Sequence, residues 1–457
     1  MEVNEFPYRV PSINLMPRRC PGMGCEVEVF QVTTRLDCGS AYCGPLFVHM
    51  NKIPRTVIFY FNGTFLRREN GAHARASSFV DFLIRTFDRV IVYSYLNHPT
   101  CPWSHHLIES FKALYPTASL VLDESTQPMK VLTRLKNFAI ALFPSMTKLI
   151  LALRAPGAAP NYRNLIKTEP GALLVINYAD GLTQLNGIDR NDIVVETHDV
   201  KFANYNKQTK SKASSLRSIQ KFRGELALLD AAGAIIAISP MEASFFRMML
   251  TDAEIFYIPH FGPSYASAAG EDGIDAPYKY DLVFVGSDNI LNVDGLLRFW
   301  REEHAWVHKF RFAICGKVCE HPAVSAYAAL HQNISLLGFV DDISRVYAGS
   351  EAAVSPVDGT GLKIKIIDAL AHGRPVFASP QSLDGLPVGY EGSVFPIDRR
   401  YIEQILGNPP ARQAAQRAAA IYYSRFCEIG DTERFTHYAR APADCPINVT
   451  SLNPVKP

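Results

Sequence analysis

The chain of 457 residues lacks the features that mark several large classes of protein. It has no apolar run of about 18 residues, and basic residues and Pro144 interrupt the nearest candidate, Val131–Ala152, so we expect no membrane span. The first residues, MEVNEFPYRVP, carry acids and prolines in place of a basic and then an apolar segment, so we expect no secretory signal. Low-complexity tracts and internal repeats are also absent, which excludes solenoids and collagen-like chains.

Several catalytic motifs are missing as well. The sequence contains no G-x-S-x-G elbow, no H-E-x-x-H zinc site and no Walker A loop. It also contains no Asp-x-Asp triplet of the kind that holds a divalent cation. We therefore expect no catalytic metal.

Cysteine is sparse, with nine residues, an odd number. Without a secretion signal, these residues are expected to be reduced thiols in a cytoplasmic protein. Four of them form two pairs with the same internal spacing, Cys20 with Cys25 and Cys38 with Cys43. The spacing leaves three interpretations open: chance, two pairs of buried thiols, or one structural zinc ion.

The small net charge of +2 hides an asymmetry between the two halves. Residues 1–270 hold 28 Lys and Arg against 22 Asp and Glu, whereas residues 271–457 hold 18 against 22. Two stretches, Ser125–Thr168 and Val200–Gly224, each contain seven basic residues and no acid. Such a basic half suits an anionic partner (phosphate, acidic lipid or nucleic acid), or it is simply a solvated basic face.

Short apolar runs alternate with amphipathic stretches along most of the chain, which predicts parallel strands joined by helices. In the first half, strands are expected at Thr56–Phe61, Arg89–Tyr95, Ser119–Leu122, Ala172–Asn177, Ile193–Glu196, Ala234–Ile238 and Glu254–Ile258. In the second half, they are expected at Asp281–Val285, Phe310–Ile314, Ile334–Leu336, Ala352–Ser355 and Pro375–Ala378. The fold class is therefore α/β, with two doubly wound domains facing each other across a cleft.

The expected organisation has five parts. They are an irregular N-terminal segment (1–55), a first domain (56–262), a linker rich in small residues (263–279), a second domain (280–408), and a C-terminal helix and tail (409–457) that pack back toward the first domain.

The most informative segment, SPVDGTGLKIKIIDALAHGRPVFASP, spans Ser355–Pro380. Gly359 and Gly361 would let the backbone approach a ligand, and a helix is expected to begin near Gly361. The N-terminus of a helix favours a phosphate, and Lys363 and Lys365 would add full positive charges. Asp368, two turns further on, could accept hydrogen bonds from ribose hydroxyls.

This segment resembles the donor-nucleotide segment of GT-B glycosyltransferases, in particular glycosyltransferase family 4 (glycosyl transferases group 1). The similarity is clearest in DALAHGRPV, at positions 368–376. Further similar fragments are FVGS at 284–287, ICGK at 314–317, LLGFVDD at 336–342 and, in the first half, ETHD at 196–199 and ISPME at 238–242.

The resemblance implies a metal-independent enzyme that needs no cofactor and moves a sugar, with retention, to an acceptor hydroxyl. The donor would be a UDP- or GDP-linked sugar, and the acceptor a glycan or a lipid-linked molecule in glycan or glycoconjugate biosynthesis; no nucleic-acid partner is implied. The implied donor-binding residues are Gly286, Ser287, Lys317, Phe339, Val340, Gly359, Thr360, Gly361, Leu362, Lys363 and Asp368. A loop of the first domain, with Asn62, Gly63, Asn70, Gly71 and Arg75, would face the phosphates or the acceptor, unless its arginines lie on the surface.

Two departures from the family pattern leave other functions open. The first of two acidic positions is Thr360, and the usual Arg and Lys after the first strand of the second domain are missing. The diphosphate charge would then depend on Lys363, Lys365, Lys317 and the helix N-terminus. A sugar-nucleotide 2-epimerase and a non-catalytic nucleotide-sugar-binding protein are the alternatives.

Two catalytic residues are expected. Lys365 would stabilise the leaving diphosphate. His198, which follows the strand Ile193–Glu196, would orient the attacking hydroxyl at the edge that faces the cleft. The alternative for His198 is an imidazole that its neighbour Asp199 merely satisfies.

The segment Met129–Arg154 interleaves apolar side chains with five basic residues. Since many transferases that this chain resembles act on lipid-linked acceptors, one expectation is a peripheral contact with an anionic membrane, at its inner face. The other is that the apolar residues are ordinary core. Pro144 predicts two short helices instead of one.

Overall fold

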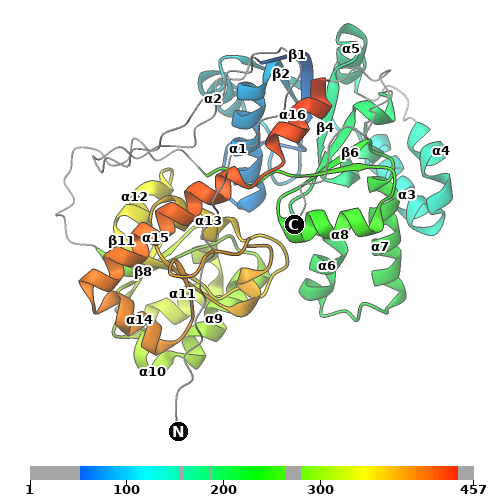
Figure 1. Ribbon diagram of the computed structural model, residues 1–457. Helices are drawn as coiled ribbons and strands as arrows, with labels where there is room; N and C mark the ends of the chain where they lie inside the picture. The colour runs from blue at the N-terminus through cyan, green and yellow to red at the C-terminus, as the bar shows by residue number, and fades with distance from the viewer. Residues whose placement is uncertain (1–51, 154–158, 186–187, 263–278, 441–457) are drawn as a thin grey trace, which may run out of the picture. The chain divides into compact units, whose positions relative to one another are not determined.

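The chain forms two parallel sheets connected by helices (Figure 1). The computed structural model describes residues 52–153, 159–185, 188–262 and 279–440. All of these residues belong to one compact unit. The four patterned cysteines and most of the expected linker lie outside the described residues. The α/β fold of two doubly wound domains is confirmed.

The first sheet has seven strands in the order β3-β2-β1-β4-β5-β6-β7. They are β1 (Ile53–Tyr60), β2 (Phe87–Tyr95), β3 (Ala118–Asp123), β4 (Leu173–Asn177), β5 (Ile193–Glu196), β6 (Ala234–Ala237) and β7 (Glu254–Tyr257). Successive residues of β1 alternate between the two faces, so that Val57 and Phe59 join one core cluster, and Ile58 and Tyr60 join another. Both faces of this sheet are therefore buried, as the uninterrupted apolar strands predict.

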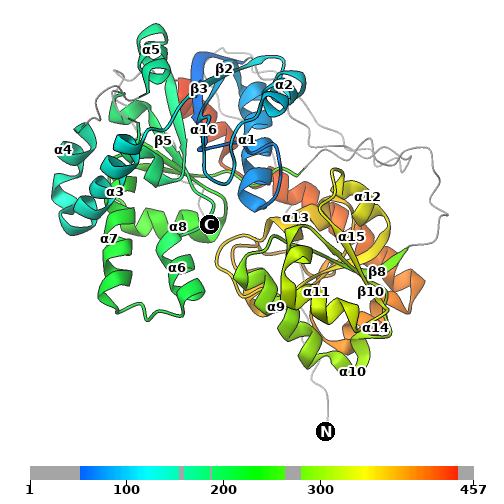
Figure 2. The ribbon, with the colours of Figure 1, turned by 180° about the vertical axis from the view of Figure 1, so that it is seen from behind.

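Helices cover both faces of the first sheet (Figures 1 and 2). One face holds α1 (Gly71–Thr86), α2 (His105–Leu114) and α16 (Thr432–Arg440). The other holds α3 (Gln127–Leu142), α4 (Thr147–Ala152), α5 (Pro160–Thr168), α7 (Leu216–Leu229) and α8 (Pro240–Met249), with α6 (Lys201–Thr209) against α7. The chain breaks between α3 and α4 at Pro144, as predicted.

The second sheet has six strands in the order β10-β9-β8-β11-β12-β13. They are β8 (Tyr280–Val285), β9 (Phe312–Cys315), β10 (Ile334–Gly338), β11 (Ser350–Ser355), β12 (Val376–Ala378) and β13 (Val394–Pro396), the last of which was not predicted. The helices of this half are α9 (Ile290–Glu302), α10 (His304–Val307), α11 (Pro322–Ala329), α12 (Ile343–Ala348), α13 (Ile364–Ala371), α14 (Arg399–Leu406) and α15 (Pro409–Glu428).

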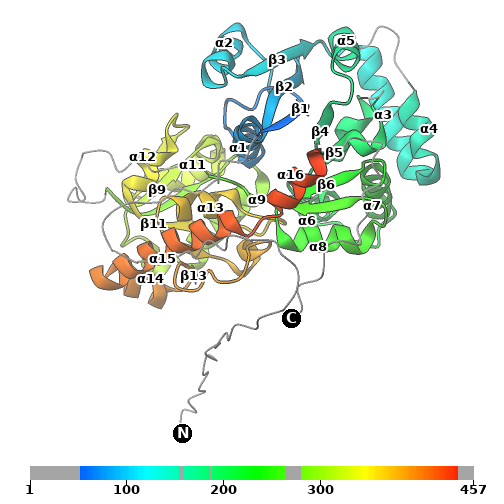
Figure 3. The ribbon, with the colours of Figure 1, turned by 45° about the horizontal axis from the view of Figure 1, so that its top comes forward.

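The C-terminal helix α16 packs on the first sheet, although it follows the second sheet in the sequence (Figure 3). The guanidinium of Arg434 donates to Glu254 at 2.7 Å, and that of Arg55 donates to the carbonyl of Ala439 at 3.1 Å. Within the described part of the chain, no helix combines the length and the hydropathy that a membrane span requires.

Candidate active site at the strand ends

Several of the predicted site residues follow strands at the two points where the strand order reverses. In the first sheet the reversal lies between β1 and β4, and in the second it lies between β8 and β11. Loops at the carboxyl ends of such strands diverge and leave room for a ligand. Asn62 follows β1, Gly286 follows β8, and the loop Gly359–Lys363 follows β11.

The glycine-rich loop is built around the side chain of Lys363. Its Nζ donates to the carbonyl oxygens of Gly359, Thr360 and Gly361 at 3.0, 3.1 and 2.6 Å. Gly361 has φ of +71°, a conformation that favours glycine. Helix α13 starts only at Ile364, which corrects the predicted start near Gly361.

The structure also corrects the part expected of Lys363 in binding phosphate. An ammonium has three N–H donors, and the three loop carbonyls use all of them. Burial lowers the pKa of Lys363 to about 8. Lys363 therefore shapes the loop.

Lys365, one of the two predicted catalytic residues, is partly buried and is linked through Asn292 to Ser287, a predicted donor-binding residue. Its Nζ donates to Oδ1 of Asn292 at 2.8 Å and lies 4.1 Å from the centroid of the Phe284 ring. Asn292 in turn donates to the carbonyl of Ser287 at 3.1 Å. Burial and the charge of Lys363 lower the pKa of Lys365 to about 7.

No carboxylate among the described residues forms an ion pair with Lys365. The cation therefore lies where the sequence lacks the Arg and Lys of the family pattern, with only an amide and an aromatic ring as partners. An anion bound beside Ser287 would supply the missing counter-charge.

The other predicted donor-binding residues have different surroundings. Lys317 is paired with Glu69, whose Oε2 lies 2.8 Å from Nζ, and this bond raises the pKa of Lys317. Phe339 is 46% exposed after β10, with Val340 half-buried beside it. Asp368 lies on α13, and its Oδ1 is 3.4 Å from Nε2 of His260. Asp368 and Phe339 are both partly accessible to solvent.

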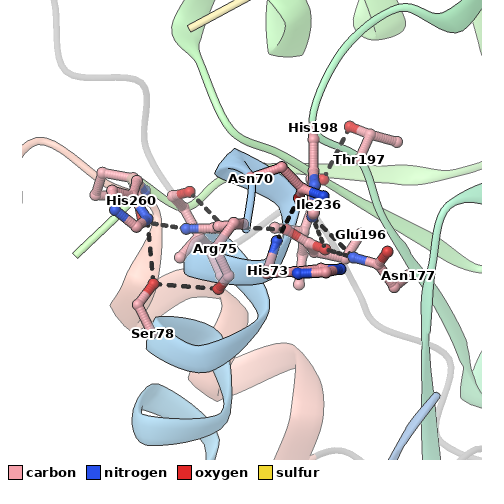
Figure 4. Close-up of polar contacts among 12 residues, drawn as sticks. Asn70, His73, Arg75, Ser78, Asn177, Glu196, Thr197, His198, Ile236 and His260 are labelled. Atoms are coloured by element: carbon pink, nitrogen blue, oxygen red, sulfur yellow. Dashed lines mark hydrogen bonds and ion pairs between the residues drawn. The ribbon is translucent and has the colours of Figure 1, made fainter. Parts of the chain in front are cut away.

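His198 belongs to a buried network at the end of β5 (Figure 4). Its Nε2 lies 2.7 Å from Oε2 of Glu196, and its ring centroid lies 4.7 Å from that of Tyr178. Its partner is thus Glu196, which corrects the alternative that Asp199 satisfies the imidazole. Its Nε2 also lies 2.8 Å from Nδ2 of Asn177, and its Nδ1 has no hydrogen-bond partner in the described chain.

Arg75 is the positive partner of the same network (Figure 4). Its Nε donates to Oε1 of Glu196 at 2.8 Å, and its terminal nitrogens donate to the carbonyls of Pro259 and Ile258 at 2.5 and 3.0 Å. Burial alone would raise the pKa of Glu196, but His198 and Arg75 outweigh it and hold the pKa below its usual value. Arg75 was predicted either to face the phosphates or to lie on the surface. Both predictions are wrong, because its side chain is fully buried.

Asn70, Gly71 and Gly63, which also belong to the predicted first-domain loop, have structural contacts at or before the start of α1. Asn70 caps the helix, with Oδ1 accepting from the backbone N–H of His73 at 3.0 Å. A Cβ on Gly71 would lie 3.3 Å from the Ile364 side chain, and one on Gly63 would lie 2.7 Å from the Cys101 carbonyl. Because glycine has no Cβ, Gly71 allows the side chain of Ile364 to approach the backbone closely, and Gly63 does the same for the carbonyl of Cys101.

Glu242 is a site residue that the sequence did not single out, although it lies in the matching fragment ISPME. It is fully buried on α8, and burial together with Asp199 raises its pKa to about 8. A Cβ on Gly361 would lie 3.0 Å from Oε1 of Glu242 and 3.3 Å from both the His198 carbonyl and Cβ of Asp199. The loop of the second sheet thus meets the acidic residues of the first.

The acids in this region do not form a metal site. Among the residues that the structure describes, no group of three His, Cys, Asp or Glu side chains is arranged to hold a metal ion. The four described cysteines are free thiols, three of them buried.

In a sequence comparison, the part of the chain that contains the second sheet matches a known family. Residues 279–406 match the family described as glycosyl transferases group 1. No curated protein sequence matches the chain. The family match contains Gly286, Lys317, the glycine-rich loop and Asp368.

Solved structures share the fold of both sheets. A sucrose-phosphate synthase from Thermosynechococcus elongatus is 13% identical, with a TM-score of 0.54, covering 81% of this chain and 94% of its own. A point mutant of TarM from S. aureus, in complex with Fondaparinux, alpha-GlcNAc-glycerol and UDP, is 8% identical, with a TM-score of 0.55, covering 84% and 98%. Anabaena HepE, in complex with UDP and glucose, is 15% identical, with a TM-score of 0.50, covering 84% and 97%. The fold is that of GT-B glycosyltransferases, and the resemblance found in the sequence is confirmed.

Proposed function

We propose that this protein is a glycosyltransferase that binds a nucleotide-diphosphate sugar on the second sheet and an acceptor on the first. The observation that carries the proposal is Lys365, which has the amide of Asn292 and no carboxylate as its partner, in a domain that matches glycosyl transferases group 1. TarM and HepE have the same fold and were solved with UDP, which supports a UDP-linked donor over a GDP-linked one.

In this reaction the bond between the anomeric carbon and the diphosphate breaks, and an acceptor oxygen takes the place of the leaving group. Lys365 stabilises the charge that develops on the diphosphate, with the N-terminus of α13 adding partial positive charge. Nδ1 of His198 accepts a hydrogen bond from a sugar or acceptor hydroxyl and so orients it. With retention, the acceptor proton leaves on the departing diphosphate.

Asp368 and Phe339 complete the donor site in this proposal. The carboxylate of Asp368 accepts hydrogen bonds from the ribose, and the exposed ring of Phe339 lies beside the base. Burial and the charge of Asp199 raise the pKa of Glu242 to about 8, which favours its protonated form, and its carboxyl lies close to the backbone of Gly361. No step requires a metal ion.

One observation favours a second candidate, a non-catalytic nucleotide-sugar-binding protein. Thr360 replaces the acid of the family pattern, and its buried Oγ1 has no hydrogen-bond partner among the described residues. Such a protein would bind the donor and leave its glycosidic bond intact.

Thermal unfolding with a panel of UDP- and GDP-linked sugars, followed by assays of nucleotide release with and without acceptors, tests these candidates. A donor at a hundredfold its Kd should stabilise the protein by about 2.7 kcal/mol. Release that requires an acceptor and persists with a chelator supports the transferase, whereas interconversion of the sugar nucleotide without an acceptor indicates an epimerase. Binding without turnover supports the binding protein. If no nucleotide sugar stabilises the chain, the proposal is wrong.

A further inference from the structure

Exposed apolar side chains gather on α3, on the segment after it and on α4. Of the 21 large hydrophobic side chains that are exposed in the described residues, seven lie between Val131 and Leu153. These seven define the α3–α4 surface: Val131, Leu135, Phe138, Phe143, Met146, Leu149 and Leu153. The prediction that the apolar residues of this segment are ordinary core is wrong for Val131, Leu135, Phe138, Phe143 and Leu149, whereas Ile140 and Ile150 are buried in the core.

Helix α3 exposes an apolar face in addition to the apolar side chains, Met129 and Ile140, that it buries in the core. Val131, Leu135 and Phe138 follow one another on one face, and they are 53%, 59% and 64% exposed. Lys136 is buried on the other side, where its Nζ donates to the carbonyls of Leu151 and Thr183 at 3.1 and 3.2 Å. A helix that faces water normally places its polar side chains outward, so this face is built to contact something other than water.

The charge around the surface specifies its partner. The sequence has no acid from Ser125 to Thr168, and Arg134 and Lys148 are exposed between the apolar residues. The neighbouring α7 exposes Arg217, Lys221 and Arg223. A second copy of the chain would bring like charges together, whereas an anionic partner would neutralise them.

We propose that the α3–α4 surface docks on an anionic lipid bilayer. The apolar side chains enter the interface between headgroups and acyl chains, and the basic residues bind the headgroups. Helix α3 contacts both α4 and α7, and the three helices lie together in all three views (Figures 1, 2 and 3), so the apolar and basic residues come from neighbouring elements.

A pocket of about 570 Å³ is lined by Phe138 on α3, by Arg217 and Lys221 on α7, and by Tyr178 and Asp199. The Tyr178 ring packs against His198, so the lining of the pocket includes one residue of the α3–α4 surface and one neighbour of the proposed acceptor site. An acceptor on a lipid carrier with an anionic headgroup fits this arrangement, a conclusion that rests on the proposed function.

Co-sedimentation with vesicles tests the docking. The full chain should bind vesicles that contain phosphatidylglycerol, should bind far less to vesicles of phosphatidylcholine alone, and should be released by high salt. Absence of binding to either vesicle, or equal binding to both, would overturn the proposal.

Matched variants locate the contact. Leu135→Ser combined with Phe138→Ser should reduce binding more than ten-fold, because two apolar anchors are lost. Leu330→Ser combined with Val388→Ser, which changes two other exposed apolar residues, should leave binding unchanged. Arg134→Gln should weaken binding roughly five-fold, while Arg345→Gln should not.

Two further measurements separate this proposal from its alternatives. Thermal unfolding and nucleotide binding of the Leu135→Ser, Phe138→Ser variant should match those of the wild type, because both side chains are exposed. A dimer that this variant abolishes would show that the surface binds a second copy, and so would overturn the docking. Wild-type protein that binds vesicles but no nucleotide sugar would contradict the proposed function and leave the docking supported.

Discussion

The two sheets have the same kind of topology but opposite charges at their strand ends. In the first sheet, the acids Glu196, Asp199 and Glu242 gather there, and Glu196 is neutralised by the buried Arg75. In the second sheet, Lys363 and Lys365 gather there with carbonyl and amide partners in place of carboxylates. Removing one partner of a buried ion pair leaves the other charge uncompensated and lowers the stability of the fold. A cation without a counter-charge, in contrast, is available to a ligand.

The largest effect should come from breaking the paired charges of the first sheet. Glu196→Ala leaves the buried Arg75 without its carboxylate and should lower the free energy of unfolding by about 3–5 kcal/mol. Chemical denaturation measures this loss, with the exposed Glu109→Ala as the control, expected to change stability by less than about 0.5 kcal/mol. A stable Glu196→Ala protein would show that this network does not support the fold.

Removing the unpaired cation of the second sheet should affect turnover more than stability. Lys365→Ala should lower turnover ten- to a thousand-fold, about 1.4–4 kcal/mol in activation free energy, because the leaving diphosphate loses its counter-charge. Its free energy of unfolding should not fall, because Lys365 forms no ion pair among the described residues and its removal relieves the cost of burying a charged amine. Lys309→Ala, which removes an exposed lysine of the same half, is the control. Unaltered turnover in Lys365→Ala would show that Lys365 does not stabilise the leaving diphosphate, and the proposed difference between the two sheets would then be wrong.

Asp368 tests whether the acids of the second sheet also serve the donor. Asp368→Ala should weaken nucleotide binding by about 1.5–3 kcal/mol, the range for hydrogen bonds to a charged group. Titration calorimetry measures the affinity, and Asp294→Ala, which removes an exposed acid from α9, serves as the control. An affinity equal to that of the wild type would place Asp368 outside the donor site.

The smallest effect is a dependence on pH that belongs to Lys365. Its pKa of about 7 means that the amine is charged below this pH and neutral above it. Donor affinity should therefore fall as pH rises through 7, by at most about tenfold per pH unit. The free energy of unfolding should instead rise with pH between 7 and 10.5. In this range Lys365 is still protonated in the unfolded chain but has lost its proton in the folded chain, so raising the pH favours the folded state. Both trends should be absent from Lys365→Ala.

Local patterns in the sequence predicted the architecture. Runs such as TVIFYF can only be buried strands, and the β5 strand, Ile193–Glu196, has the predicted bounds. The break at Pro144 also followed from a local rule, since proline lacks the N–H that a continuous helix requires. The grouping of glycines, lysines and Asp368 predicted a donor segment, and this segment lies within the family match.

Predictions failed where a side chain depends on distant residues. Arg75 and Lys136 look like surface cations in the sequence, yet their partners, Glu196 and the Thr183 carbonyl, come from elements far along the chain. Gly361 and Lys363 look like the first turn of a helix, but Lys363 binds the preceding carbonyls and delays the helix to Ile364.

The sequence by itself determined the order of strands and helices and the residue types at the strand ends, because these depend on hydrophobic periodicity and turn chemistry within a few residues. Only the tertiary structure decided which charges are neutralised. Lys363 and Lys365 are two residues apart, yet one is surrounded by loop carbonyls and the other lies beside Asn292 and Ser287. Burial and pairing are properties of the folded neighbourhood, since the energy of a charge depends on all the groups around it and not on its neighbours in the chain.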